Sequence, residues 1–258
     1  MFFDSHCHID RIDLTQFENS FDVLMQKIAE QEVTEMVCIS VNLEDYEKMQ
    51  ALIKPYPNIY ASVGVHPDYE DAKEPDVDIL VNLSKDKNIV AIGETGLDYI
   101  QPSEYEWQRD RFRVHIEAAK QAKLPLIVHT REAQKDTIDI LKQHQAADVG
   151  GVLHCFTEDW AMAKQAIELN FYISISGIVT FKQAKNVHEM AKQIPDDRLL
   201  IETDAPWLAP VPYRGKTNHP GLVPYVAQHL ANLRGTSVEH IAEVSRYNAQ
   251  QLFKLKSS

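Results

Sequence analysis

The chain opens with Met1-Phe2-Phe3-Asp4-Ser5-His6-Cys7-His8, an apolar run that passes into polar residues. We interpret this stretch as a short β-strand. Because side chains alternate between the two faces of a strand, His6 and His8 should point one way and Cys7 the other. Two imidazoles side by side at a strand end can hold a divalent metal ion, although two ordinary histidines would give the same pattern.

Seven more short apolar runs follow, and longer helical patterns separate them. The eight predicted strands cover residues 2–6, 36–41, 59–65, 89–93, 126–129, 151–154, 172–176 and 199–203. The clearest helical patterns cover residues 104–123, 131–144 and 158–169. The segment Thr236-Ser237-Val238-Glu239 reads as a capping box, which predicts a last helix that ends near residue 254.

This alternation of strands and helices is typical of a parallel α/β sheet. The strands are apolar nearly throughout, which suits strands covered on both faces. Polar residues recur where the strands end, and a chain of 258 residues has the usual size of a (β/α)8 barrel. We therefore expect one α/β domain over residues 1–258, a single (β/α)8 TIM barrel with a C-terminal helix. An open doubly wound sheet remains the alternative.

The composition is that of an ordinary globular protein, with 44% hydrophobic and 25% charged residues. The formal net charge of −12 argues against binding duplex DNA by bulk attraction to phosphate. It does not exclude a nucleic-acid end held by bound metal ions, which carry their own positive charge.

Cysteine usage and hydropathy bear on the cellular compartment. The three cysteines, Cys7, Cys38 and Cys155, are widely spaced and imply no disulfide framework. No signal-peptide pattern and no apolar run long enough to span a membrane is present. We expect a cytoplasmic protein with no membrane association and no obligate protein partner.

Metal-competent side chains stand at five predicted strand ends: His6 with His8, then Glu94, His129, His154 and Asp204. Singly, Glu94 could be a buried carboxylate paired with a basic residue, and Asp204 could start a turn. Together, four imidazoles and two carboxylates are too many for one tetrahedral ion with an open position. They suit two neighbouring ions, with Glu94 on the middle strand as the bridge.

These residues belong to a series of motifs: Asp4-Ser5-His6-Cys7-His8, Gly64-Val65-His66-Pro67, Gly93-Glu94-Thr95-Gly96-Leu97-Asp98-Tyr99, Val128-His129-Thr130-Arg131-Glu132-Ala133, His154-Cys155-Phe156 and Glu202-Thr203-Asp204-Ala205-Pro206. In this order, over essentially the whole chain, they resemble the TatD family of metal-dependent deoxyribonucleases in the amidohydrolase superfamily. The resemblance implies a TIM barrel with a two-metal centre. It implies that His6, His8 and Asp204 hold one ion, that His129 and His154 hold the other, and that Glu94 is shared. Related binuclear hydrolases bridge their ions with a modified lysine, and the glutamate here favours the TatD branch.

The chain departs from the family pattern in one loop, where Thr217-Asn218-His219-Pro220 replaces the frequent Arg-Asn-Glu-Pro. The resemblance therefore implies no substrate contact for His219. We predict that His66 contacts substrate, unless it is an ordinary histidine at the barrel mouth. Arg131 could clamp a phosphate or could form an ion pair at a helix start. Arg214, in a short basic loop, could steer a phosphodiester or could be merely solvated.

The other histidines fall in helical patterns, and we predict that they lie on the outer surface of the barrel: His115, His144, His188, His229 and His240. Cys7 and Cys155 neighbour predicted ligands in the sequence. Because they should point away from those ligands, we expect them to pack rather than to act as nucleophiles.

The favoured hypothesis is a deoxyribonuclease that binds two divalent ions per chain (Mg²⁺, Mn²⁺ or Zn²⁺) and cleaves phosphodiester bonds in single strands or strand ends. A metal-activated water would attack phosphorus, Glu94 would bridge the ions, and Asp204 would accept the proton. The same centre could instead hydrolyse a small amide, ester or phosphoester. A non-catalytic metal-binding protein is the third hypothesis.

Overall fold

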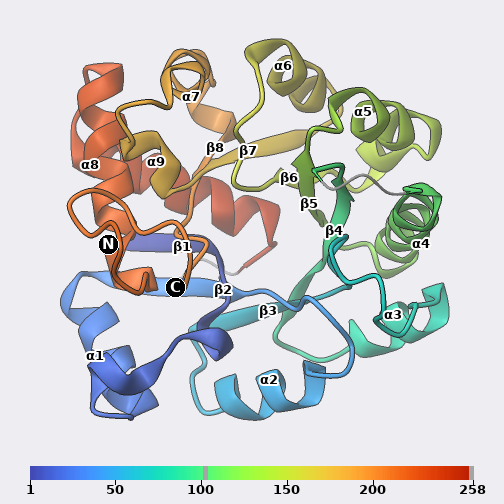
Figure 1. The fold of residues 1–258 in the computed structure, drawn as a ribbon, viewed down its shortest axis with the longest axis horizontal. Coiled ribbons are helices and arrows are strands. Elements are labelled where there is room, and N and C mark those ends of the chain that lie inside the picture. Colours follow the sequence, from blue (N-terminus) through green and yellow to red (C-terminus); the bar gives the residue numbers. More distant parts are fainter. Residues whose placement is uncertain (101–103, 256–258) are drawn as a thin grey trace.

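The computed structural model describes residues 1–100 and 104–255; the expected domain also includes 101–103 and 256–258, which lie outside the described residues. The described residues form eight parallel strands in one sheet, ordered from β1 to β8 around a barrel. The strands are β1 (Phe2–Cys7), β2 (Val33–Cys38), β3 (Ile59–Val63), β4 (Ile89–Asp98), β5 (Leu126–Arg131), β6 (Gly151–Leu153), β7 (Phe171–Ile175) and β8 (Leu199–Ile201). Figure 1 shows them as a central ring with helices outside.

Two backbone hydrogen bonds join the first strand to the segment that follows the last one. The amide of His8 donates to the carbonyl of Ala205 at 2.7 Å, and the amide of Asp204 donates to the carbonyl of His6 at 3.0 Å. These bonds nearly close the sheet, so the predicted (β/α)8 TIM barrel is confirmed.

Helices connect the strands and cover the barrel. The α-helices are α1 (Phe21–Glu30), α2 (Tyr46–Ile53), α3 (Val77–Leu83), α4 (Glu106–Ala122), α5 (Gln134–Gln143), α6 (Trp160–Glu168), α7 (Lys185–Ala191), α8 (Val223–Arg234) and α9 (Val238–Leu252). Short 3₁₀ turns lie at η1 (Ile9–Arg11), η2 (Leu14–Phe17), η3 (Ala146–Asp148), η4 (Gly177–Thr180), η5 (Asp196–Arg198) and η6 (Pro220–Leu222).

All four predicted helices begin slightly later in the structure, α4 at Glu106 rather than at residue 104 and α6 at Trp160 rather than at residue 158. Helix α5 begins at Gln134 rather than at residue 131, because β5 continues through Arg131. The predicted last helix is α9, and its N-cap is Ser237, whose hydroxyl accepts the amide of His240 at 3.1 Å. The capping position therefore falls one residue after Thr236.

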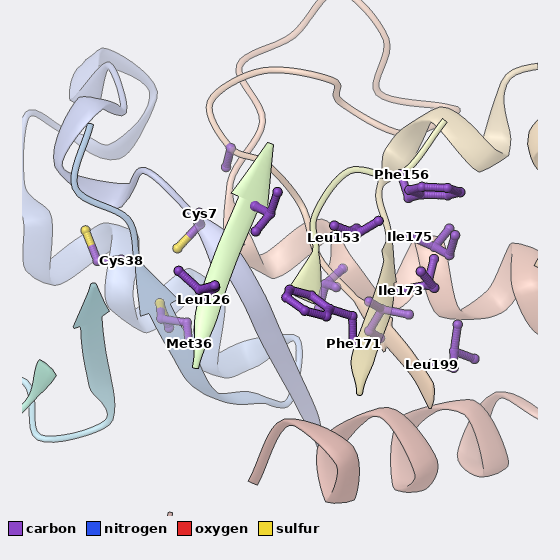
Figure 2. Packing of buried hydrophobic residues seen from close by; sticks show 14 of the residues in the cluster. Cys7, Met36, Cys38, Leu126, Leu153, Phe156, Phe171, Ile173, Ile175 and Leu199 are labelled. Carbon is purple, nitrogen blue, oxygen red and sulfur yellow. The ribbon is translucent and has the colours of Figure 1, made fainter. Parts of the chain in front are cut away.

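The core has two layers. The larger lies between the strands and the surrounding helices, and Figure 2 shows part of it, including Phe171 and Ile173 of β7. Cys7 belongs to this outer layer, as the prediction from strand alternation requires. The smaller cluster joins inward side chains of the strands to the end of α9, where Phe253 stacks on Phe3 near the start of β1. The C-terminal helix thus covers the amino ends of the strands.

The prediction that the helical histidines lie on the surface is wrong for His115, which is completely buried in α4. Its Nε2 accepts the amide of Val65 at 3.0 Å, and its Nδ1 donates to the carbonyl of Arg111 at 2.8 Å. Burial lowers the pKa of His115 to about 4, so the ring is neutral and its two bonds satisfy it inside the core. His144, His188, His229 and His240 are partly exposed.

No helix among residues 1–100 and 104–255 combines the length and apolar character that a membrane crossing requires.

Candidate metal centre

The barrel brings all six predicted ligands together where its strands end. His6 lies in β1 with His8 just after it, Glu94 lies within β4 and His129 within β5. His154 directly follows β6, and Asp204 follows β8 by three residues. All of these but His6 line a cavity of about 670 Å³ at this end of the barrel.

Close packing of two backbones sets the position of Glu94. Gly93 has φ +146°, and a Cβ added there would lie 2.5 Å from the carbonyl oxygen of Ile127. A Cβ added at Gly64, after β3, would lie 2.4 Å from the backbone of Gly93. Only glycine allows this approach, which brings His66 and Glu94 into contact from neighbouring strands.

Glu94 lies between two groups of histidines and turns one oxygen toward each. Its Oε2 is 3.3 Å from Nε2 of His6 and 3.7 Å from Nε2 of His8. Its Oε1 is 2.6 Å from Nε2 of His154 and 3.3 Å from Nδ1 of His129. A carboxylate in this position can serve two cations at once.

The first group has the spacing of a tetrahedral site. The Nε2 atoms of His6 and His8 are 3.3 Å apart, and Oδ1 of Asp204 lies 3.7 and 3.5 Å from them. Ligand atoms about 2.1 Å from a tetrahedral cation are separated by roughly 3.4 Å. The atoms of His6, His8 and Asp204, with Oε2 of Glu94, match that separation.

The second group contains one imidazole more than the sequence predicted. Nδ1 of His129 and Nε2 of His154 are 3.2 Å apart, and both face Oε1 of Glu94. His66, predicted to contact substrate, places its Nε2 at 3.2 Å from the same oxygen. His66 therefore lies within reach of an ion held by the second group.

The carboxylates and imidazoles of the cluster shift one another's pKa values. Burial alone would raise the pKa of Glu94, but the neighbouring histidines, His154 foremost, hold it well below its ordinary value. Burial would likewise lower the pKa of His154, but Glu94 and Glu202 raise it well above its ordinary value. The pKa of Asp204 lies low because contact with His8 outweighs burial. Glu94 and Asp204 are thus ionised, whereas burial lowers the pKa of His6 and keeps that ring neutral.

The residues fit divalent metal ions. Oε2 of Glu94, which faces His6 and His8, is buried and has no hydrogen-bond partner among the described residues. The facing ring nitrogens of His6 and His8 also need a shared proton or a cation between them. Imidazole ligands favour Zn²⁺ or Mn²⁺, and carboxylates also suit Mg²⁺.

Two carboxylates that the sequence analysis did not assign orient the histidines. Oδ2 of Asp98 lies 2.9 Å from Nε2 of His129, and Oε1 of Glu202 lies 3.3 Å from Nδ1 of His154. Carboxylates in this position fix the tautomer of a ligating imidazole and raise its basicity. Their spacing in the sequence could have indicated these roles. Asp98 is four residues after Glu94 and Glu202 is two before Asp204, and residues an even number apart on a strand lie on the same face.

The TatD-related DNase family model matches residues 3–254. The chain belongs to the TatD-related DNase family. It is 42% identical to a metal-dependent hydrolase of Escherichia coli K12, YcfH, over 99% of this chain and 96% of that one. It is 40% identical to the metal-dependent hydrolase YabD of Bacillus subtilis 168, over 99% of this chain and 100% of that one. Both relatives are described as uncharacterised.

Solved structures agree with this family assignment. The crystal structure of YjjV, a TatD homologue from Escherichia coli K12, superposes with a TM-score of 0.89 at 26% identity. The superposition covers 99% of this chain and 98% of YjjV. This chain is therefore a metal-dependent hydrolase of the TatD family, with the metal-competent cluster described above.

The two predicted phosphate-binding arginines of this TatD-family chain lie in different environments. Arg131 is exposed at the end of β5, lines the cavity, and forms no ion pair with any described residue. Arg214 is exposed outside the cavity lining, with its guanidinium carbon 4.0 Å from the ring centroid of Phe181. The structure brings Arg131 to the cluster but not Arg214.

The loop that departs from the family pattern carries His219 away from the cavity. The ring of His219 packs edge-on against Phe17, with centroids 5.4 Å apart, and burial lowers its pKa to about 4. Its neighbour Asn218 is buried and donates to the carbonyls of Thr203 and Trp207 at 2.9 and 2.6 Å. His219 is thus a packing residue, and Asn218 fixes the loop after Asp204.

Cys155 does not point away from the predicted ligands, as strand alternation had suggested, but lines the cavity with them. Its φ of +41° turns the chain directly after His154, which breaks the strand alternation on which the prediction relied. The thiol lies 3.0 Å from the hydroxyl of Ser176, and burial raises its pKa well above the ordinary value. The protonated thiol agrees with the prediction that Cys155 is not a nucleophile.

Proposed function

We propose that this chain is a two-metal phosphodiester hydrolase that acts on single-stranded DNA or strand ends. The observation that carries the proposal is the position of Glu94, whose two oxygens face two separate groups of histidines. One tetrahedral ion could use only one of these groups. The family model, described as TatD-related DNase, supports DNA as the substrate.

The ligands divide between the two ions. We propose that His6, His8 and Asp204 hold the first ion, that His129 and His154 hold the second, and that Glu94 is shared. His66 adds a possible further ligand to the second group, in addition to its predicted contact with substrate. Two ions held here would lower the pKa of a water molecule and neutralise charge on the phosphoryl oxygens.

The remaining residues position the reactants and move a proton. The side chain of Asp204 is 14% exposed and its pKa is depressed, so an ionised carboxylate meets the cavity. It can orient the attacking water and accept its proton. Arg131 can donate to a phosphate next to the scissile one, and Arg214 could contact only a more distant part of a strand.

Degradation of a single-stranded oligodeoxynucleotide by metal-reconstituted protein tests the proposal. Mg²⁺, Mn²⁺ and Zn²⁺ should be tried separately, and bound metal measured by elemental analysis. We expect nucleotide release that Glu94→Gln abolishes and that Glu106→Gln, an exposed carboxylate variant on α4, leaves intact. No release by protein with about two bound ions per chain would reject the proposal.

The size of the cavity and the charge of the chain favour a second candidate. A cavity of about 670 Å³ suits a small molecule, and a net charge of −12 repels polyanions. The same centre could then hydrolyse a small amide, ester or phosphoester. Turnover of such compounds much faster than DNA would decide for this candidate. Equal behaviour of wild type and Glu94→Gln in every assay would instead favour a non-catalytic metal-binding role.

We also propose that residues 1–258 act as one hydrolase domain in the cytoplasm. The free state of Cys7, Cys38 and Cys155 supports a reducing compartment. Activity of the protein alone would support the absence of an obligate protein partner.

A further inference from the structure

Trp207 exposes a large aromatic side chain at the rim of the metal-competent cavity. The residue is 51% exposed, and its ring lies edge-on to that of His8 with centroids 5.0 Å apart. Of the large apolar side chains that are exposed in residues 1–100 and 104–255, only that of Trp207 lines this cavity. An exposed indole does not contribute the stabilisation that burial of its ring would give, so packing in the hydrophobic core does not explain a tryptophan at this position.

The backbone under the ring is fixed although the ring is exposed. The amide of Trp207 donates to the carbonyl of Asp204 at 3.0 Å. Its carbonyl accepts the buried side chain of Asn218 at 2.6 Å. Trp207 is therefore held next to two proposed ligands, His8 and Asp204, before any ligand binds. On a fixed backbone, only the two side-chain torsions of the tryptophan have to be ordered when another ring stacks on it.

The cavity wall has a distinct polar side. Trp207 lines it next to His8, on the side of the first group, and Arg131 lines it two residues after His129 on β5, on the side of the second group. A phosphodiester held over Glu94 would thus have an apolar aromatic surface at one end and a guanidinium at the other. Nucleotides offer a flat base and a charged phosphate in this same alternation.

We propose that Trp207 stacks the base adjacent to the scissile phosphate, and that this contact makes the site specific for unpaired nucleotides. The inference rests on the proposed nuclease function. A cavity of about 670 Å³ has the size of a pocket for one small ligand, so an unpaired nucleotide fits it better than a duplex does. Stacking is also tolerant of base identity, because every base has a flat π face. The specificity is therefore for unpaired ends, with little preference among the four bases.

Strand cleavage by Trp207→Ala and Trp207→Phe tests the proposal on two substrates, a single-stranded oligodeoxynucleotide and the same strand with abasic terminal residues. Base–aromatic stacking corresponds to a change of roughly 5- to 150-fold in binding. We expect Trp207→Ala to raise KM for the normal strand by that factor, with kcat close to wild type. On the abasic strand, which has no base to stack, wild type and Trp207→Ala should have equal KM values. Trp207→Phe should retain most of the normal affinity.

Tryptophan fluorescence separates this inference from the proposed function. Thymidine 5′-monophosphate should quench the metal-loaded wild type and the control Trp160→Phe, whose ring lies on α6 away from the cavity. Trp207→Phe should lose that quenching. If Trp207→Phe were quenched as strongly as wild type, or if Trp207→Ala raised KM equally for both strands, the stacking role would be overturned. Quenching through Trp207 without strand cleavage would support the stacking contact and reject the nuclease.

Discussion

Replacing Asp98 by asparagine should weaken the binding of one metal ion and leave the binding of the other unchanged. The buried Asp98 carboxylate lies 2.9 Å from Nε2 of His129, which leaves Nδ1 of that ring facing Glu94. The asparagine side chain has nearly the same shape but no negative charge. It would make His129 a weaker base and could turn its amide group toward the ring instead of its oxygen.

The expected magnitude follows from the role of Asp98 outside the ligand set. Loss of such a partner typically reduces metal affinity 10- to 100-fold, or about 1.4–2.7 kcal/mol. The pKa of His129 is raised by Asp98 and Glu94 against the effect of burial. The substitution would therefore also lower the pKa of His129, so that protons compete less with the metal ion for this ring. At acidic pH this effect partly offsets the loss of metal affinity. Titration near pH 8 reduces this compensation, because protons compete less with the metal ion for an imidazole as the pH rises.

Isothermal titration of metal-free protein with Mn²⁺ measures the effect on each site. We expect Asp98→Asn to lower the affinity of one ion, while the ion at His6, His8 and Asp204 keeps its affinity. Asp136→Asn is the matched control, because Asp136 pairs with Arg109 and Tyr99 outside the cavity lining. Wild-type affinity at both sites of a folded Asp98→Asn protein would refute the orienting role.

Three further outcomes follow from the structure. The pKa of His115 is about 4 in the folded protein and about 6.5 when unfolded, so the unfolded state takes up protons first. The contribution of the neutral His115 ring to the free energy of unfolding is fully present above about pH 6.5 and is lost as the pH falls toward 4. In urea unfolding we expect the free energy of unfolding to be about 2 kcal/mol lower at pH 5 than at pH 8, and this loss to be smaller in His115→Gln. Gly93→Ala should lower the free energy of unfolding by about 3 kcal/mol or more, because the added Cβ would meet the carbonyl of Ile127. The control Gly215→Ala, whose Cβ would have nothing within 4 Å, should lower it by about 1–2 kcal/mol through its positive φ alone. Equal melting temperatures of the two variants would contradict this. Chelation should lower the melting temperature and added metal should restore it, since an ion at 100 times its Kd adds about 2.7 kcal/mol; an unchanged melting temperature would argue against tight binding.

Sequence patterns predicted most of the fold because they report local physics. Each predicted strand overlaps one of β1–β8, since apolar runs of this length are typical of strands covered on both faces. The bounds differ most at β2, which begins three residues before the predicted start, and at β4, which continues to Asp98. His6 and His8 point together, as strand alternation requires. The errors fall where the chain leaves regular structure: Cys155 turns into the cavity through a positive φ, and α5 starts late because β5 is longer than its apolar part.

The prediction of a surface position for His115 overlooked its helical spacing. His115 is three residues after Phe112 and four before Ala119, which places it on the buried face of α4. The packing of α4 against the loop after β3 then gives Nε2 the amide of Val65, and Nδ1 bonds within α4 to the carbonyl of Arg111. The local sequence did not indicate the packing of His219, which replaces an acid of the family pattern and packs against Phe17.

The sequence by itself determined which chemistry the chain carries, because residue types at strand ends fix the available ligands. Only the tertiary structure shows how those side chains are grouped in space. It turned the two oxygens of Glu94 toward different histidine groups, added His66 to one of them, and placed Asp98 and Glu202 behind the rings. Distances between side chains on separate strands depend on barrel closure and on close backbone approach at Gly64 and Gly93, and neither is encoded in any local pattern.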